Sequence, residues 1–373
     1  MVSASASPRP VMTVDLAAVV RNYGLVCAHV KNARVGAVVK ADAYGLGAPV
    51  IAPVLAKAGC RQFYVATTDE GAALVPHLTQ SAGHRIFVLG GASDDPALTS
   101  VINTLGDVEA LRERARRTGT AQRAALHVDT GMNRLGLSAG DFAGLIDDPQ
   151  GLEGIAPELI MSHLACADTP GMPQNALQLS RFEALRARLP ATPASLANSA
   201  GVLLGQPYHF DVVRPGIALY GGNPLGTDAN LFHPTVTVEA PLLQVRFIDK
   251  GDSVGYAATY RAGGTARIAT IAAGYADGIL RAASNRGSVV IGGHVAEIVG
   301  RVSMDLITVD VTAVPADVAV PGAMAQLIGP QRSLDAVARD ARTISYEVLT
   351  RLGGRLERRY AAGNETSAEG RGA

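Results

Sequence analysis

Lys40 is the first residue of this chain whose neighbours suggest chemistry. It directly follows the short apolar run Val35 to Val39, which is rich in β-branched residues, as a buried parallel strand usually is. The lysine would then emerge from the carboxyl end of that strand. It could be an ordinary exposed residue that closes the strand. The apolar strand would also partly desolvate its amine, however, and such an amine can form a Schiff base.

Four later segments also carry reactive or anion-binding side chains at the ends of apolar runs. They are HVDTGMNRLG with Arg134, SHLACAD with His163 and Asp168, ANSAG with Asn198 and Ser199, and VRPGIALYG with Arg214, Gly216 and Ile217. Singly, these residues fit a surface ion pair, a core histidine or a helix cap. The ANSAG segment opens a predicted helix whose free amides could hold an anion. If these segments lie on the same rim of one fold, a lysine, two arginines and an anion site occur together there. Purely structural roles explain each residue singly but not this combination.

The elements that must position these residues alternate between strand and helix patterns. A helix is predicted at Leu16 to Val30, capped by Thr13 and Asp15, and eight strand-helix units follow between Arg34 and Ala218. Strands that alternate with helices pair in parallel through right-handed crossovers. Eight such units predict an α/β fold with a TIM-type (β/α)₈ barrel, in which catalytic groups gather at the carboxyl ends of the strands.

The pattern changes at GGNPLGTDANLFHP, residues 221–234, which is typical of a linker. Beyond it, short apolar segments separated by glycine turns predict a mostly β domain. Its predicted strands include Val236 to Val238 and, separately, Leu242 to Ile248, and one helix is predicted at Leu334 to Ala341. The expected domains are a barrel over residues 11–232, a β domain over 233–361 and a disordered tail over 362–373.

Composition narrows the class of protein. The 373 residues contain 33 Lys plus Arg and 33 Asp plus Glu, so neither nucleic acid nor a membrane surface is an expected partner. No apolar run approaches the roughly 20 residues of a membrane span, and the amino-terminal stretch lacks the apolar core of a signal peptide. These features predict a cytoplasmic protein. Cys27, Cys60 and Cys166 have no paired spacing and are expected to be reduced, and no metal site is predicted.

Seven motifs together resemble one enzyme family. They are VVKADAYGLGA, HVDTGMNRLG, NSAG, RPGIALYGG, SVGYAATYRA, GYADG and GRVSMDL. Their order and separations resemble those of alanine racemases, over about residues 11–360. The resemblance implies pyridoxal 5'-phosphate as cofactor, an external aldimine of the amino acid, and interconversion of L- and D-alanine that supplies D-alanine for peptidoglycan. It also implies a head-to-tail homodimer whose active sites combine the barrel of one subunit with the β domain of the other.

The same resemblance implies roles for individual residues. Lys40 would hold the cofactor and act as one catalytic base, and Tyr256 of the partner subunit would be the opposing base. Arg214 would face the pyridine nitrogen, Arg134 the phenolic oxygen, and His163 would lie behind the ring and tune Tyr256. The remaining cofactor-binding residues would be Tyr44, Asn198, Ser199, Gly216 and Ile217. Substrate would meet Arg134 and the backbone of Met304, and the entrance would be lined by Tyr275, Asp168, Arg281 and Arg301.

Elementary chemistry is consistent with two bases. Racemisation removes a proton from one face of the α-carbon and returns one to the other face. Tyrosine has an ordinary pKa near 10, and lowering it by about three units takes about 4 kcal/mol of preference for the phenolate. Positive charge on His163 and Arg214 could supply that preference. An arginine at the pyridine nitrogen would donate a hydrogen bond but not a proton, which favours a short-lived carbanion and racemisation over transamination.

Two departures from the family pattern concern the pocket. His127 stands where family members often carry a lysine that can be carbamylated, so a carbamate should be absent beside Arg134. The segment RLGGRLERRY lacks an expected proline, and Gly353 and Gly354 replace a bulkier lining. Serine therefore stays open as an additional substrate.

Three other functions fit part of the sequence. A two-domain decarboxylase of basic amino acids would place a glutamate at the pyridine nitrogen and a cysteine near the substrate, where this chain has Arg214 and Ser303. A non-catalytic pyridoxal-phosphate carrier would need no second domain. A cofactor-independent Schiff-base aldolase would use Lys40 but explains neither Arg214 nor the β domain.

Overall fold

The computed structural model describes residues 9–78, 83–227 and 229–362, and these divide into two compact units. The barrel unit contains residues 20–219 and the described part of 223–232. The β unit contains described residues 9–19, 220–222 and 233–362. Of the tail predicted to be disordered, residues 363–373 lie outside the described part of the chain.

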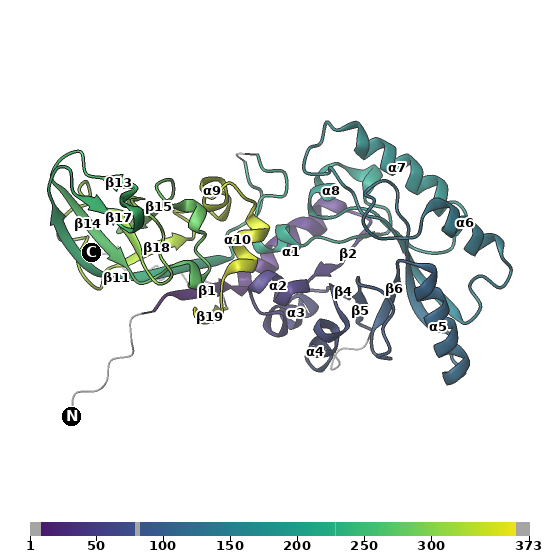
Figure 1. The fold of residues 1–373 in the computed structure, drawn as a ribbon. Coiled ribbons are helices and arrows are strands. Elements are labelled where there is room, and N and C mark those ends of the chain that lie inside the picture. The colour runs from purple at the N-terminus through teal and green to yellow at the C-terminus, as the bar shows by residue number, and fades with distance from the viewer. Residues whose placement is uncertain (1–8, 79–82, 228, 363–373) are drawn as a thin grey trace, which may run out of the picture. The chain divides into compact units, whose positions relative to one another are not determined.

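Parallel strands form the centre of the barrel unit (Figure 1). Their order is β3 (Ala37–Val38), β4 (Gln62–Val65), β5 (Arg85–Val88), β6 (Thr99–Ile102), β7 (Gln122–His127), β8 (Ile155–Met161) and β9 (Ala194–Ser195). The ring is completed by β10 (Val212–Val213), which pairs in parallel with β2 (Arg34–Val35). On its other side, the Asp211 N–H donates a 3.0 Å hydrogen bond to the carbonyl of Ala194. The predicted (β/α)₈ barrel is confirmed.

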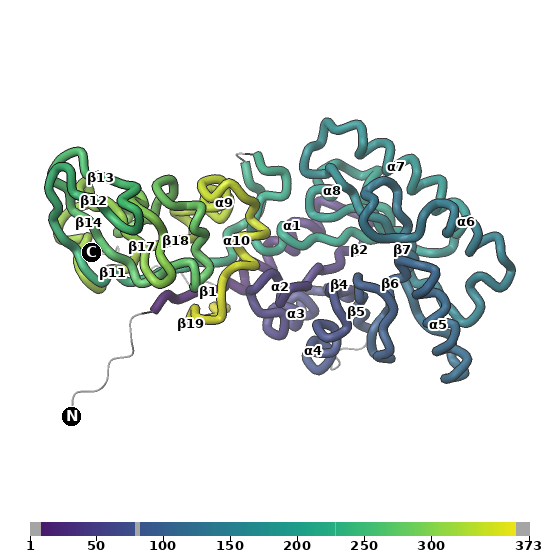
Figure 2. Tube along the Cα trace, in the orientation of Figure 1, coloured from purple at the N-terminus to yellow at the C-terminus, as the bar shows by residue number. Residues whose placement is uncertain are grey.

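Helices cover the outside of these strands, as the Cα trace shows for α3 to α7 (Figure 2). The helices are α1 (Leu16–Val30), α3 (Ala48–Lys57), α4 (Thr68–Leu78), α5 (Leu105–Thr118), α6 (Ala139–Asp147), α7 (Pro173–Arg186) and α8 (Ser199–Leu203), with 3₁₀ turns η1 (Gln206–Tyr208) and η2 (Ile217–Tyr220). The bounds of α1 match the prediction, and Asp15 Oδ1 accepts the Ala18 N–H at 2.9 Å as its cap.

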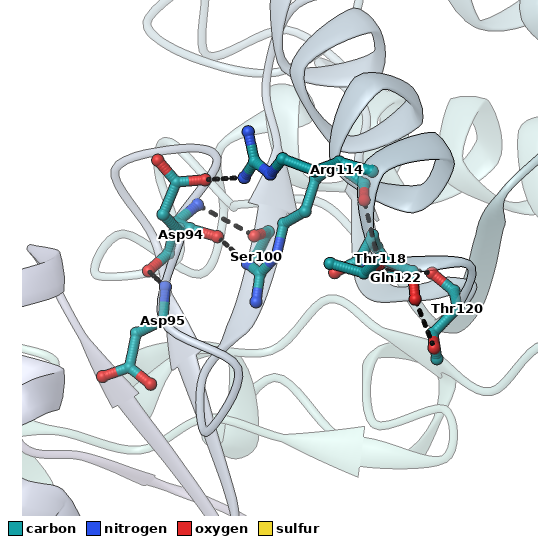
Figure 3. A network of polar contacts seen from close by, with 9 residues as sticks. Asp94, Asp95, Ser100, Arg114, Thr118, Thr120 and Gln122 are labelled. Atoms are coloured by element: carbon teal, nitrogen blue, oxygen red, sulfur yellow. Dashed lines mark hydrogen bonds and ion pairs between the residues drawn. The ribbon is translucent and has the colours of Figure 1, made fainter.

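A polar network ties α5 to the strands on either side of it (Figure 3). The buried guanidinium of Arg114 donates to the carbonyl of Ser93, whose own N–H donates to Ser100 Oγ at 3.0 Å. At the end of α5, Thr118 Oγ1 donates to the Arg114 carbonyl at 2.9 Å and accepts from Gln122 Nε2 at 3.1 Å. This network fixes the outer wall of the barrel beside β6 and β7.

The β unit is built on one sheet that closes on itself and is antiparallel except for its last pair of strands. Its order is β14 (Ala266–Ile271), β17 (Ile307–Asp310), β16 (His294–Ile298), β15 (Ser288–Ile291), β18 (Met324–Ile328), β11 (Val236–Ile248), β1 (Val11–Asp15) and β19 (Glu357–Ala361). The long strand β11 also pairs with β14, which closes the ring from β14 to β11. The other elements are β12 (Ser253–Val254), β13 (Tyr260–Arg261), α9 (Leu334–Asp340), α10 (Ser345–Arg351), η3 (Tyr256–Ala258), η4 (Tyr275–Asp277) and η5 (Arg281–Ala283). The mostly β character of this domain is confirmed.

Several details of the β unit differ from the sequence-based prediction. The two strands predicted at Val236 to Val238 and Leu242 to Ile248 are one strand, β11. Pro241 lies where this strand changes partner from β18 to β14, and the lost N–H of proline is tolerated at such irregularities. The elements β1, β19 and α10 were not predicted. Because β1 pairs with β11 and β19, residues 11–15 lie in the β unit, although the predicted barrel range began at residue 11.

Within the described ranges, no helix combines the length and the apolar character that crossing a bilayer requires.

Candidate active site

Lys40 lies two residues beyond the end of β3, at the carboxyl ends of the barrel strands, as predicted. The turn that it opens, α2 (Lys40–Gly45), is left-handed: Ala41, Asp42, Ala43 and Tyr44 have φ between 52° and 58°. A left-handed conformation costs non-glycine residues roughly 1–2 kcal/mol each, and such strain is concentrated at functional sites. The pKa of Lys40 is lowered by burial and by the positive charge of Arg134, with Glu70 acting in the opposite direction. The amine is therefore more easily deprotonated, as a Schiff-base-forming lysine requires.

Arg214 is a buried cation inside the barrel, with 3% of its surface exposed. Its Nη1 donates to Ser195 Oγ and its Nη2 donates to the Ser162 carbonyl at 2.5 Å. Both acceptors are neutral, and no carboxylate of the described residues forms an ion pair with it. Burial lowers the pKa of Arg214 to about 10, so it stays charged at neutral pH. A buried charge of this kind is expensive unless an electron-rich group pairs with it.

The residues expected to hold a phosphate group surround the start of α8 and η2. The Asn198 side chain caps α8 by accepting the Gly201 N–H at 2.9 Å, and Ser199 Oγ accepts the N–H groups of Gly216 at 2.8 Å and Ala218 at 3.3 Å. A Cβ atom on Gly216 would lie 2.2 Å from the Tyr44 hydroxyl oxygen. Only glycine leaves room for the Tyr44 hydroxyl at this position, and the hydroxyls of Tyr44 and Ser199 lie there with the N–H groups of Gly216 and Ala218, so the residues fit an anionic head group. Ile217 begins η2 directly beyond Gly216 and is fully buried.

Two histidines near Arg214 are uncharged at neutral pH. The pKa of His163 lies well below its ordinary value, because of burial first and then the charges of Arg214 and Arg134. Burial and Arg214 likewise lower the pKa of His127 to about 4. His163 therefore does not contribute the positive charge that we expected from it, and of the two expected sources only Arg214 remains.

The orientation of His127 is set by Asn103. Asn103 Nδ2 donates to the Leu89 carbonyl at 3.0 Å, so its Oδ1 is left to accept from His127 Nδ1 at 2.7 Å. The proton of the neutral imidazole then lies on Nδ1. Arg134 is exposed in the loop after β7, which Asp129 braces by accepting N–H groups from Gly131 to Asn133 at 2.8 to 3.2 Å. In addition to burial, the positive charge of Arg134 lowers the pKa values of Lys40, His127 and His163.

The β unit gathers a second set of predicted site residues. Tyr256 lies on η3 with 71% of its surface exposed, and it is followed by Ala257 and Ala258 at φ 60° and 48°. A Cβ on Gly255 would come 3.3 Å from the backbone nitrogen of Arg301, so the Tyr256 and Arg301 segments are adjacent. This strained turn presents the phenol outward, which is unusual for a residue with only a structural role.

The remaining predicted residues fall into both units. Tyr275 N–H donates to the Ser303 carbonyl at 3.0 Å and Ala276 N–H donates to the Met304 carbonyl at 3.0 Å, so the Tyr275 and Met304 segments lie together in the β unit. Arg281 begins η5 in that unit. Asp168 is exposed in the loop after β8 of the barrel unit. The structure thus groups the lysine and the anion-binding residues in one unit and the phenol, Arg301 and Met304 in the other.

Several supporting residues were missed by the sequence analysis. Glu70, Asn103, Ser162, Ser195 and Gln178 all bond to the segments named above. Fully buried Gln178, for example, donates to the His163 carbonyl at 2.9 Å and accepts the Ala165 N–H at 2.8 Å. A glutamine at a helical core position was the available signal, because a buried amide must be paired.

Known proteins resemble the chain along nearly its whole length. The family model described as alanine racemase, N-terminal domain, matches residues 14–224, and that of the C-terminal domain matches residues 235–360. An alanine racemase of Rhodospirillum rubrum is 46% identical, with 96% of this chain and 97% of the relative covered. A catabolic alanine racemase of Agrobacterium fabrum is 44% identical, with 94% and 91% covered.

Solved structures agree with this relationship. Alanine racemase from Bartonella henselae with covalently bound pyridoxal phosphate superposes with a TM-score of 0.89 at 39% identity, and covers 95% of this chain and 99% of its own. Matches of this identity and coverage, together with both domain models, establish the relationship. The chain therefore belongs to the alanine racemase family, a family of isomerases.

Proposed function

We propose that this protein interconverts L-alanine and D-alanine with pyridoxal 5'-phosphate, using Lys40 and the partner subunit's Tyr256 as two bases. The observation that carries the proposal is Lys40 itself. Its amine stands at the carboxyl end of a barrel strand, on a strained turn, with a lowered pKa. The same rim contains Gly216, packed against the Tyr44 hydroxyl, and the buried Arg214, which no carboxylate of the described residues neutralises.

The barrel residues fit the cofactor. The amine of Lys40 would hold its aldehyde carbon, the donors around Ser199 and Gly216 would hold its phosphate, and Arg214 would face its ring nitrogen. When bound, the cofactor stabilises negative charge on the substrate α-carbon. Arg214 would donate a hydrogen bond and keep its own proton, which would leave that stabilisation moderate and favour rapid return of a proton to the α-carbon.

Proton transfer is the part performed by the chain's own acids and bases. The Lys40 amine would take or return the α-proton of D-alanine on one face of the α-carbon, and the partner subunit's Tyr256 would take or return that of L-alanine on the other face. Arg134 would orient the substrate from the barrel rim, and the Met304 backbone of the partner subunit would contact its carboxylate.

A homodimer is proposed because Tyr256 is exposed. A general base works best in a water-poor site, yet the phenol of Tyr256 lies 71% exposed on the β unit. A second copy that places its barrel rim over Tyr256 would cover the phenol and supply Lys40. Tyr275, Arg281 and Arg301 of the same β unit, with Asp168 of the barrel unit, would line the entrance.

We also propose a cellular role for this activity. D-alanine is a component of peptidoglycan, and supply of this amino acid from L-alanine in the cytoplasm fits an enzyme of this family. The relative from Agrobacterium fabrum carries the name of a catabolic enzyme. Breakdown of D-alanine is therefore the alternative cellular role.

The test uses the purified full chain loaded with pyridoxal phosphate. L-alanine and D-alanine are incubated separately, and both enantiomers are quantified by chiral chromatography. We expect both reactions to reach equal amounts of the two enantiomers, with no turnover by Lys40→Ala. Bound cofactor with unchanged enantiomers, or release of carbon dioxide from a basic amino acid, would contradict the proposal.

A further inference from the structure

We propose that Glu70 is a positioning residue that holds Lys40 in place through the left-handed turn that follows it. The inference rests on the proposed function of Lys40, and it concerns a residue to which the family motifs above assign no role. Glu70 lies in the first turn of α4, half-buried, on the barrel rim.

The Glu70 carboxylate joins the ends of two neighbouring barrel strands. Its Oε1 accepts the Ala41 N–H at 2.9 Å, directly after Lys40, and its Oε2 accepts the Ala66 N–H at 2.7 Å, directly after β4. Hydrogen bonds from backbone amides to a charged carboxylate are stronger than neutral ones. Glu70 N–H donates in turn to Thr67 Oγ1 at 3.3 Å, which fixes the start of α4.

The turn needs such support. Its four left-handed residues include no glycine, so the backbone is held against its own preference. Ala43 N–H donates to the Val39 carbonyl at 2.8 Å and Gly47 N–H donates to the Asp42 carbonyl at 2.9 Å, which close the turn on itself. The Glu70 carboxylate links Ala41, the first left-handed residue of the turn, to Ala66, directly after β4.

The carboxylate also affects the charge of the lysine. The charged and titratable groups that interact with Lys40 are Arg134, His163 and Glu70. Burial and Arg134 lower the pKa of Lys40, and Glu70 raises it. Glu70 therefore limits how far the lysine pKa falls while it also fixes where the amine stands.

Asp42 offers a matched control within the same turn. Its Oδ1 accepts the Ala48 N–H at 2.8 Å, so it supports the turn from the far side, and it is absent from the groups that shift the Lys40 pKa. Asp42→Asn keeps an acceptor oxygen for Ala48 and removes one negative charge. Glu70→Gln also removes one charge, but it places an amide N–H₂ against one of two backbone donors.

The experiment measures the lysine without any substrate. The cofactor is removed from the full-length protein, and the rate of Lys40 carbamoylation by cyanate is followed against pH by peptide mass spectrometry. We expect Glu70→Gln to move the midpoint of this curve down by about half a pH unit or more, because a negative charge near the ammonium is lost. Asp42→Asn should leave the midpoint unchanged. An unshifted midpoint in Glu70→Gln, or an equal shift in Asp42→Asn, would overturn the proposal.

Kinetics separate positioning from a general loss of structure. In the loaded enzyme, Glu70→Gln should lower kcat about tenfold or more with little change in KM, since the base and not the binding of alanine is displaced. If Glu70→Gln does not fold, Glu70→Asp serves instead. It keeps the charge but is too short to reach both N–H groups, so kcat should fall with little change in the labelling midpoint. Wild-type kcat in Glu70→Asp would overturn the positioning role. Because labelling requires no turnover, it remains informative even if alanine is not the substrate.

Discussion

Arg214 Nη2 donates a 2.5 Å hydrogen bond to the carbonyl oxygen of Ser162, the residue directly before His163. Ser195 Oγ accepts a second hydrogen bond from the same guanidinium, donated by Nη1. Neutral acceptors fix the position of the group and do not neutralise it. No carboxylate among the described barrel residues pairs with this charge, so it is available to an electron-rich group bound beside it.

The first prediction concerns the product ratio set by Arg214. Arg214→Glu would present a group that can share a proton with the cofactor ring, which strengthens electron withdrawal and lengthens the life of the carbanion. We expect slower racemisation and more pyruvate per racemisation event. Pyruvate is measured with lactate dehydrogenase while the enantiomers are separated by chromatography.

A matched arginine controls for the burial of a glutamate. Arg114 is also buried and also donates to a backbone carbonyl, but it lies in the network around α5. Arg114→Glu should lower stability and leave the product ratio unchanged. An unchanged ratio in Arg214→Glu would refute the assignment of Arg214 to the ring nitrogen.

The second prediction concerns the close contact between Gly216 and the Tyr44 hydroxyl. Gly216→Ala would place a Cβ 2.2 Å from the Tyr44 hydroxyl, so the tyrosine or the η2 backbone must move. We expect the dissociation constant for pyridoxal phosphate to rise about tenfold or more, which corresponds to about 1.4 kcal/mol. Gly144→Ala on α6 is the control, since its Cβ would meet nothing within 4 Å. Equal cofactor affinity in both variants would show that the phosphate does not bind beside Gly216.

The third prediction concerns acid stability. The pKa of His127 is about 4 in the folded protein, below the ordinary value of about 6.5 expected when unfolded. Between these values the unfolded chain binds more protons, so the contribution of His127 is fully present above pH 6.5 and is lost as the pH falls toward 4. At most it amounts to about 3 kcal/mol.

Urea unfolding across this pH range measures the effect. His127→Gln keeps an amide that can donate to Asn103 and removes the titration. We expect the difference in unfolding free energy between wild type and variant to shrink, or to change sign, as the pH falls from 6.5 to 4. A difference that is independent of pH would show that His127 is not held neutral.

The fourth prediction tests whether active sites are shared between subunits. Lys40→Ala and Tyr256→Phe are each made, unfolded together and refolded as a mixture. Half of the dimers formed at random are hybrids, and in a shared arrangement each hybrid has one of its two sites intact. Activity should therefore return to about a quarter of wild type. A mixture no more active than its separate components would contradict the shared site.

Much of the barrel rim was predictable from sequence because its signals are local. An apolar run that ends on Lys40, or an Asn198 that opens a helix, can be recognised without knowledge of distant residues. The left-handed turn after Lys40 could not be predicted, because Ala41 and Ala43 have no preference for that conformation. Its Ala41 N–H is bound by the Glu70 carboxylate, which lies 29 residues further along the chain.

The missed strands have a similar cause. The strand β1 is short, and its partners β11 and β19 come from the far end of the sequence. The continuous strand β11 was divided in two because Pro241 normally ends a strand. The neutral state of His163 also required the structure, since its lowered pKa depends first on burial of the imidazole and then on how closely Arg214 and Arg134 approach it.

The central claim is that two bases act on opposite faces, and Tyr256→Phe tests it most directly. The variant is loaded with cofactor and placed in deuterium oxide, and exchange of the α-proton is followed by NMR, separately for L-alanine and D-alanine. The account predicts that exchange from L-alanine falls far more than exchange from D-alanine, because Lys40 still serves the D-enantiomer. Exchange from L-alanine at the wild-type rate would contradict it.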